Sequence, residues 1–110
     1  MRMPPKTGVR LRKNATVLSV DQAEAIGLRA LAFLAEDPAR LGRFLALTGI
    51  GPDDLRAAAG SPANGMAVLD HLMRDESLLL VFAANAGMAP ETVVSAYQLL
   101  SRAVDGERTE

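Results

Sequence analysis

Apolar residues recur every three or four positions in six stretches of the chain, which is the spacing of amphipathic α-helices. The first stretch follows Ser19. The next two run from Pro38 to Thr48 and from Pro52 to Ala59, and the fourth starts at Pro62. The last two run from Glu76 to Ala86 and from Pro90 onward. Almost no segment alternates apolar and polar residues with the period of two that is typical of strands. We therefore predict an all-α fold of six helices.

Residues that begin and end helices stand at the edges of these stretches. Three of these residues stand just before a stretch. Each has a short side chain whose oxygen accepts a hydrogen bond from a free N–H group at the start of a helix. Glycine follows two of the stretches, where a left-handed residue ends a helix. The expected N-caps are Ser19 (with Gln22 completing a capping box), Asp37 and Asp75, and the expected C-caps are Gly49 and Gly87.

The two halves of the chain resemble each other when shifted by 38 residues. Residues 23–59 then align without a gap with 61–97, and eleven of the 37 pairs are identical. The matches include the Asp37/Asp75, Gly49/Gly87 and Pro52/Pro90 pairs at helix boundaries. Any Ala- and Leu-rich helical chain matches itself at some shift, but coinciding Gly and Pro markers favour a true repeat. We predict a compact six-helix bundle of two tandem, quasi-repeated three-helix units.

The copies differ most in the second helix of each unit. Arg40, Gly42 and Arg43 align with Leu78, Leu80 and Val81, so the helix over 76–86 is apolar all round. Such a helix is buried on most sides. We expect it to be the central helix of the bundle, the alternative being that a partner covers one of its faces. The predicted core is Leu31, Leu34, Leu41, Phe44, Leu55, Leu69, Leu72, Leu79, Phe82 and Val93.

Length and charge divide the chain into one domain with two extensions. The 110 residues, 49% of them hydrophobic, suffice for one globular core. Residues 1–18 are expected to form a flexible basic arm, because Arg2, Lys6, Arg10, Arg12 and Lys13 occur there without any acid. Residues 19–104 form the predicted helical domain, which is net acidic, and 105–110 a charged tail. The arm is either a solvated terminus or a contact for nucleic acid or anionic lipid.

Two segments around Gly49 and Gly87 have the outline of a helix-turn-helix. An apolar residue follows each glycine and another comes six positions after it, which packs two helices across a tight turn. The first turn of the second helix, which would approach DNA, carries Asp53 and Asp54 in one case and Glu91 in the other. Phosphate binding needs cations there, so charge argues against DNA binding.

The residues available for catalysis are few. The chain has no Cys and a single His, His71, which rules out thiolate chemistry and multi-histidine metal sites within one chain. His71 and Asp75 share a helical spacing, but no nucleophile motif accompanies them. Asp70, Asp75 and Glu76 adjoin a helix start, where acids serve the helix dipole. We therefore expect no enzyme activity, no cofactor and no metal.

The stretch from Ala23 to Leu100 resembles a small, uncharacterised alphaproteobacterial all-helical family, a domain of unknown function. The residues that carry the resemblance are 28–34, Asp37 and 42–49 in the first half, and 68–72 and 84–87 in the second. The resemblance covers most of the body and leaves out the basic arm. It implies a compact helical bundle of cytoplasmic bacterial origin, and it implies no activity, substrate or site.

The leading hypothesis is a non-enzymatic helical module that binds another protein or itself. The candidate interaction residues are Arg29, Arg40, Arg43 and Leu80. The alternative is a nucleic-acid-associated regulator that uses the basic arm and a helix-turn-helix-like unit. The longest apolar run, 78–84, is too short to cross a membrane, and no apolar signal segment follows the basic start. We expect a cytoplasmic protein without a membrane partner.

Overall fold

The computed structural model describes residues 18–108, and within that range it contains α-helices and no strand. The expected arm over 1–18 therefore lies, apart from Leu18, outside the described residues. The helices are α2 (Val20–Ala35), α3 (Pro38–Thr48), α4 (Pro52–Ala57), α5 (Pro62–Met73), α6 (Glu76–Ala86) and α7 (Pro90–Arg108). The prediction of an all-α fold with six helices is confirmed for this part of the chain.

The predicted helix caps are confirmed by the local geometry. Ser19 and Gln22 form a reciprocal capping box at the start of α2. Asp37 accepts a hydrogen bond from the backbone N–H of Ala39, and Asp75 accepts one from that of Leu78. Gly49 and Gly87 end α3 and α6 with φ of 77° and 71°, which is the left-handed region. Local sequence thus sets these boundaries.

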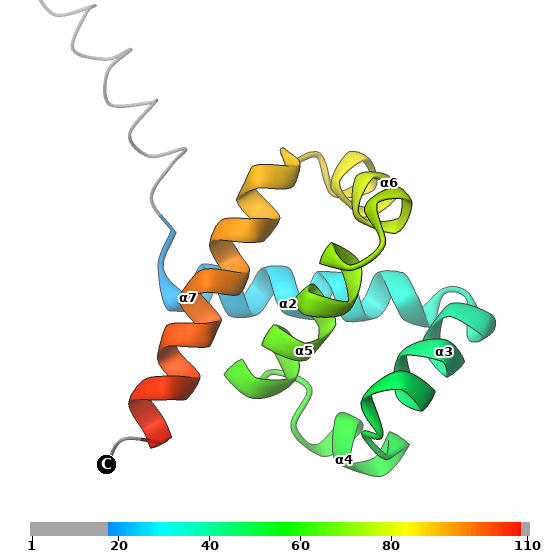
Figure 1. Cartoon of the computed structure of the whole chain (residues 1–110), viewed down its shortest axis with the longest axis horizontal. Helices are drawn as coiled ribbons and strands as arrows, with labels where there is room; N and C mark the ends of the chain where they lie inside the picture. Colours follow the sequence, from blue (N-terminus) through cyan, green and yellow to red (C-terminus); the bar gives the residue numbers. More distant parts are fainter. Residues whose placement is uncertain (1–17, 109–110) are drawn as a thin grey trace, which may run out of the picture.

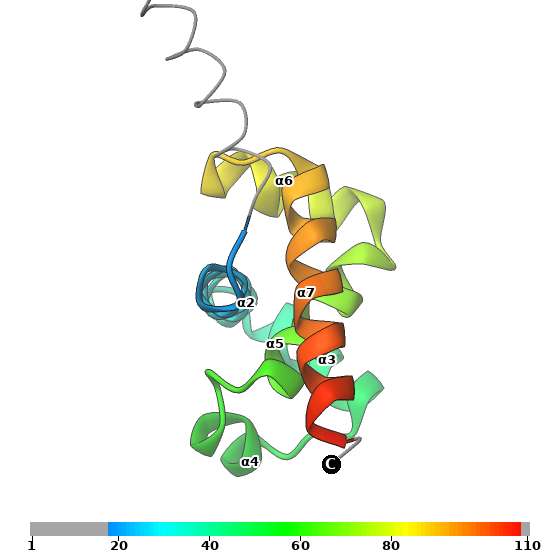
Figure 2. The ribbon, with the colours of Figure 1, turned by 90° about the vertical axis from the view of Figure 1, so that its left-hand side faces the viewer.

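Helices α2, α5 and α7 pack on one another and form the centre of the domain (Figure 1). Figure 2 looks along α2 and shows α7 running past it at a steep angle. Seven of the ten predicted core residues are buried, and Leu31, Leu41 and Leu79 pack half-buried against them. The seven are Leu34, Phe44, Leu55, Leu69, Leu72, Phe82 and Val93.

The prediction that helix 76–86 is central is wrong. Helix α6 lies at the edge of the domain and buries Phe82 and Ala83, while Leu80 and Val81 remain 47% and 43% exposed. The centre belongs to α2, α5 and α7 because small residues on these helices let their backbones approach closely. The apolar outer face of α6 is therefore left at the surface.

Helices α2 and α5 cross at close range at two buried glycines, Gly27 and Gly65. A Cβ atom built on Gly27 would lie 2.9 Å from the Cα atom of Gly65. No side chain fits between the two backbones at this point, so the distance between the helices is set by the absence of a Cβ. The crossing joins the two halves of the chain at the centre of the core.

Helix boundaries recur 38 residues apart, since α3 corresponds to α6 and the starts of α4 and α7 correspond. The third helices nevertheless differ, because α4 has 6 residues and α7 has 19. Helix α7 also continues through Gly106 to Arg108, beyond the helix end we expected at about residue 104. One glycine costs only about 1 kcal/mol in a helix, and α7 is anchored by buried Val93, Ala96 and Leu100.

Candidate interaction groove

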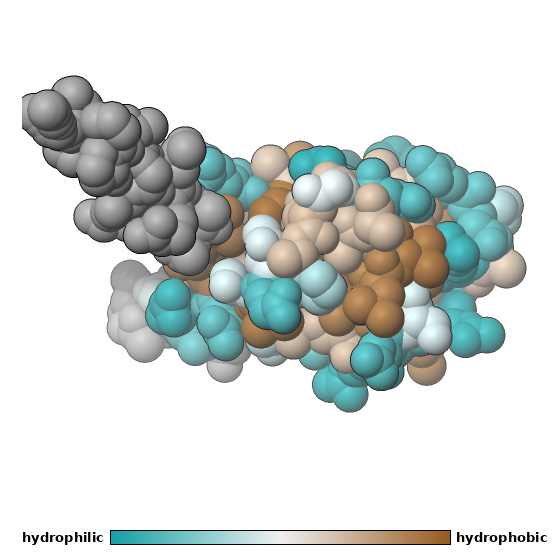
Figure 3. All heavy atoms as spheres, turned by 90° about the horizontal axis from the view of Figure 1, so that it is seen from above, coloured by the Kyte–Doolittle hydropathy of each residue, from teal (hydrophilic) through white to brown (hydrophobic). Residues whose placement is uncertain are grey.

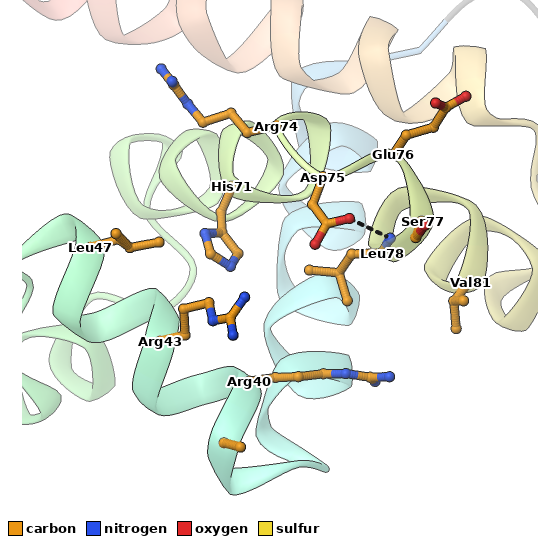
Figure 4. Close-up of a pocket in the computed structure, with 11 residues that line it drawn as sticks. Arg40, Arg43, Leu47, His71, Arg74, Asp75, Glu76, Ser77, Leu78 and Val81 are labelled. Carbon is orange, nitrogen blue, oxygen red and sulfur yellow. Dashed lines mark hydrogen bonds between the residues drawn. The ribbon is translucent and has the colours of Figure 1, made fainter.

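An open groove of about 740 Å³ runs between α3 and α6 and ends at the C-terminus of α5 (Figure 4). One wall comes from α3 and contains two arginines. The other wall comes from the first half of α6 and combines two apolar residues with two polar ones. The α3 wall is Ala39, Arg40, Arg43 and Leu47; the α6 side is Glu76, Ser77, Leu78 and Val81; the α5 end contributes His71, Arg74 and its neighbour Asp75.

The two arginines of the α3 wall differ in their surroundings. Arg40 crosses toward α2, where its guanidinium carbon lies 4.9 Å from the centre of the Phe33 ring, and its Nε is 3.7 Å from an Asp37 carboxylate oxygen. Arg43 is exposed and has no hydrogen bond or ion pair with any of residues 18–108. Its guanidinium points into the groove (Figure 4), where it is available to an incoming anionic group.

The apolar residues of the groove are unusually accessible. Leu47 on the α3 wall is 71% exposed and Val81 on the α6 wall is 43% exposed. Leu80, next to Val81 in α6, is 47% exposed but lies outside the groove lining. Figure 3, which views the domain from above, shows hydrophobic surface gathered over α6. Exposed apolar residues that gather around one concave surface are one mark of an interaction surface.

His71 closes one end of the groove and is half-buried. Its ring packs edge-on against Phe44, with 5.3 Å between the ring centres. Burial lowers the pKa of His71 below the ordinary value of 6.5; Asp75 opposes this shift, Arg43 reinforces it, and Asp70 opposes it. The neutral imidazole is therefore the form that the folded domain favours.

The lowered pKa of His71 gives the domain a specific dependence on pH. Because the unfolded chain binds the proton more tightly, this contribution to stability is fully present above pH 6.5 and is lost as the pH falls through the folded pKa. We expect the unfolding free energy of the wild type to drop across this window by more than that of His71→Phe. Denaturant titrations from about pH 7.5 down to about pH 5.5 measure the difference. Parallel pH profiles for the two proteins would contradict it.

Two acids beside the groove lie at helix ends. Asp75 caps α6 through the N–H of Leu78 at 3.2 Å (dashed in Figure 4), and an Asp70 oxygen lies 2.8 Å from Arg74 Nε. Ser77 lines the groove, but among residues 18–108 no hydrogen bond joins it to His71. Within the same range no three metal-ligating side chains gather in a cluster.

The four predicted interaction residues fall in three places. Arg40 and Arg43 lie together on the α3 wall, and Leu80 lies just outside the groove on α6. Arg29 lies elsewhere: its Nη2 donates to the backbone oxygen of Ala86 at 3.0 Å, at the end of α6. That bond satisfies a free carbonyl at a helix C-terminus. Arg29 is thus a structural residue beside a second, smaller groove of about 240 Å³.

Sequence reasoning did not place Leu47 and His71 at this site. The signal that pointed toward it was the contrast between the aligned pairs Arg40/Leu78 and Arg43/Val81. The fold sets these pairs on opposite walls of one groove, which the alignment by itself does not reveal. In the first of the two helix-turn-helix outlines, the second helix is α4, which has 6 residues and whose Asp53 pairs with Arg56 at 2.8 Å.

The described chain is thus a small all-helical domain with a groove that has two arginines on its α3 wall and exposed apolar residues on both walls. It belongs to a family described as "Protein of unknown function (DUF3572)", whose model matches residues 20–103. No curated protein and no solved structure gave a match.

In residues 18–108 no single helix is long and apolar enough to span a membrane. One pair of helices, α6 with α7, has the length and composition of a span but is bent by 101°. The cytoplasmic location stays a prediction.

Proposed function

We propose that this domain is a non-enzymatic module that binds a partner protein through the α3–α6 groove. The observation that carries the proposal is the exposure of Leu47, Leu80 and Val81 on or beside one open groove. A domain of this size gains stability from every apolar residue that it buries. Leucine and valine exposed around a concave surface therefore point to a second molecule that covers them.

We also propose that the domain is built from two copies of one helical unit, related by an approximate two-fold axis. Gly27 and Gly65 are an aligned pair, and they lie against each other at the α2–α5 crossing. The ring contact of Phe33 with Phe82, at 5.6 Å, also has a counterpart. Phe33 aligns with His71, and Phe82 aligns with Phe44. The ring centres of His71 and Phe44 lie 5.3 Å apart. Both relations are expected of a two-fold arrangement.

The repeat makes the two grooves comparable. Phe33, Glu36 and Asn85 of the smaller groove align with His71, Arg74 and Leu47 of the larger one. In the smaller groove Arg29 reaches the end of α6, whereas the residue aligned with Arg29 is Ala67. The smaller groove is thus partly filled by its own side chain, and the α3–α6 groove is the one left open for a partner.

Site-specific photocrosslinking tests the proposed surface. p-Benzoylphenylalanine placed at Leu47 is expected to crosslink a protein in the cells that produce this chain, and the same group at exposed Ala57 on α4 is not. The additional substitution Val81→Asp, across the groove, is expected to abolish the Leu47 crosslink. Equal crosslinking from both positions would contradict the proposal. A Leu47 adduct that disappears on nuclease treatment would favour the nucleic-acid alternative instead.

A further inference from the structure

The two walls of the α3–α6 groove differ in chemistry at aligned positions. Arg40 and Arg43 line the groove from α3, and the residues aligned with them, Leu78 and Val81, line it from α6. A segment lying in the groove therefore meets arginines on the α3 side and aliphatic side chains beside Glu76 and Ser77 on the α6 side (Figure 4). Only a segment with two such faces of its own satisfies both walls at once.

The three arginines that line the groove differ in whether another of the described residues pairs with them. Arg40 is held between Phe33 and Asp37, and Arg74 is paired with Asp70. Arg43 has no such bond within residues 18–108, and its charge disfavours a proton on His71 at the end of the groove. A carboxylate beside Arg43 would accept charge-assisted hydrogen bonds and offset this repulsion.

From this arrangement we infer that the groove takes an amphipathic peptide segment, with acidic residues on the face toward Arg43 and aliphatic or aromatic residues on the face toward Val81. The inference rests on the groove being the docking surface proposed above. An extended polyanion fits less well, because the groove lining also contains the acidic residues Asp75 and Glu76 in addition to its apolar residues. The spacing of carboxylates with apolar residues is therefore the expected recognition signal.

Selection from a random peptide library displayed on phage tests the inference on the full-length protein. We expect recovered peptides to combine Asp or Glu with Leu, Phe or Met at helical spacing. Their affinity is expected to fall about tenfold or more in Arg43→Glu, the loss typical of a broken charge pair. Arg56→Glu, a charge reversal on exposed α4, is the matched control and is expected to leave the affinity unchanged.

A double-substitution cycle separates recognition from indirect effects. The acidic residues of a recovered peptide are replaced by Asn or Gln, and each peptide is measured against wild type and Arg43→Glu. If Arg43 contacts a peptide carboxylate directly, Arg43→Glu is expected to lower the affinity for the acidic peptide and to leave the affinity for the neutral peptide unchanged. Additive losses would overturn the inference. Melting curves confirm that the variants fold, which their exposed positions favour.

The outcomes distinguish this inference from the proposal on which it rests. One outcome is that the recovered peptides bind Val81→Asp more weakly than the wild type, but contain no acidic residue or bind Arg43→Glu as tightly as the wild type. That outcome would overturn the acidic specificity and leave the groove as the docking surface. Peptides indifferent to both substitutions, or a selection that recovers none, would overturn both. A dimer of the chain that dissociates in Val81→Asp would identify a second copy as the occupant and would also overturn the inference.

Discussion

Phe82→Ala is expected to lower the unfolding free energy by about 3–5 kcal/mol, because the change removes a large buried side chain and leaves a cavity. Phe82 is 2% exposed, and its ring centre lies 5.6 Å from that of Phe33. It is the main residue through which the otherwise peripheral α6 enters the core. Chemical denaturation of the wild type and the variant measures the loss.

Leu47→Ala is the matched control for this prediction. Leu47 is also a large apolar residue on a helix, but it is 71% exposed. Its replacement is expected to change the unfolding free energy by less than about 0.5 kcal/mol. A loss below about 1 kcal/mol for Phe82→Ala would contradict its placement in the core.

Gly27→Ala is expected to destabilise the domain by about 1–3 kcal/mol, as overpacking does in a well-packed core. The new Cβ would meet the Cα atom of Gly65 at 2.9 Å, so the backbones of α2 and α5 must separate. The ordinary gain from replacing glycine by alanine in a helix, about 1 kcal/mol, offsets only part of this cost. Thermal and chemical melts of the variant test the prediction.

Two other glycines calibrate the effect of Gly27→Ala. A Cβ on Gly65 would first meet Leu100 Cδ1 at 2.9 Å, the end of a flexible side chain, so Gly65→Ala is expected to cost less. A Cβ on Gly42, in the middle of α3, would meet nothing within 4 Å. Gly42→Ala is expected to stabilise the domain by about 0.5–1 kcal/mol. Equal effects at all three positions would contradict the proposed role of the crossing.

Helix positions were predictable because their signals are local. A capping aspartate needs only the N–H groups two or three residues ahead, and a glycine with positive φ needs only its own backbone. Asp37, Asp75, Gly49 and Gly87 accordingly mark the ends of α3 and α6 in the structure. The start of α7 at Pro90 follows from the same kind of signal.

The position of α6 was not predictable because hydrophobicity does not say what covers a helix. The run from Leu78 to Ala84 is compatible with a central helix and with a surface helix that awaits a partner. The outcome depended on which helices pack together at the centre, and Gly27 and Gly65 allow α2 and α5 to do so at close range. With α2, α5 and α7 at the centre, Leu80 and Val81 remain at the surface.

The candidate site, like the fold, was predictable from the sequence only in part. The sequence indicated Arg40 and Arg43 as interaction residues, and these two lie in the groove. It also indicated Arg29, which lies outside this groove and bonds to Ala86 because the fold brings the end of α6, 57 residues further along the chain, within reach. A contact between residues so far apart in sequence follows from packing and leaves no mark in local spacing.

The sequence by itself determined the helices, their caps, most of the core and the contrast between the aligned helices α3 and α6. The helices and their caps depend on interactions within a few residues. The core depends on the burial of apolar side chains, and the spacing of these side chains along the chain indicates which of them are buried. The tertiary structure alone decided which helices are central and that Arg43 and Val81 face one groove. Those features depend on how closely backbones approach at a few contacts between distant residues, such as Gly27 against Gly65.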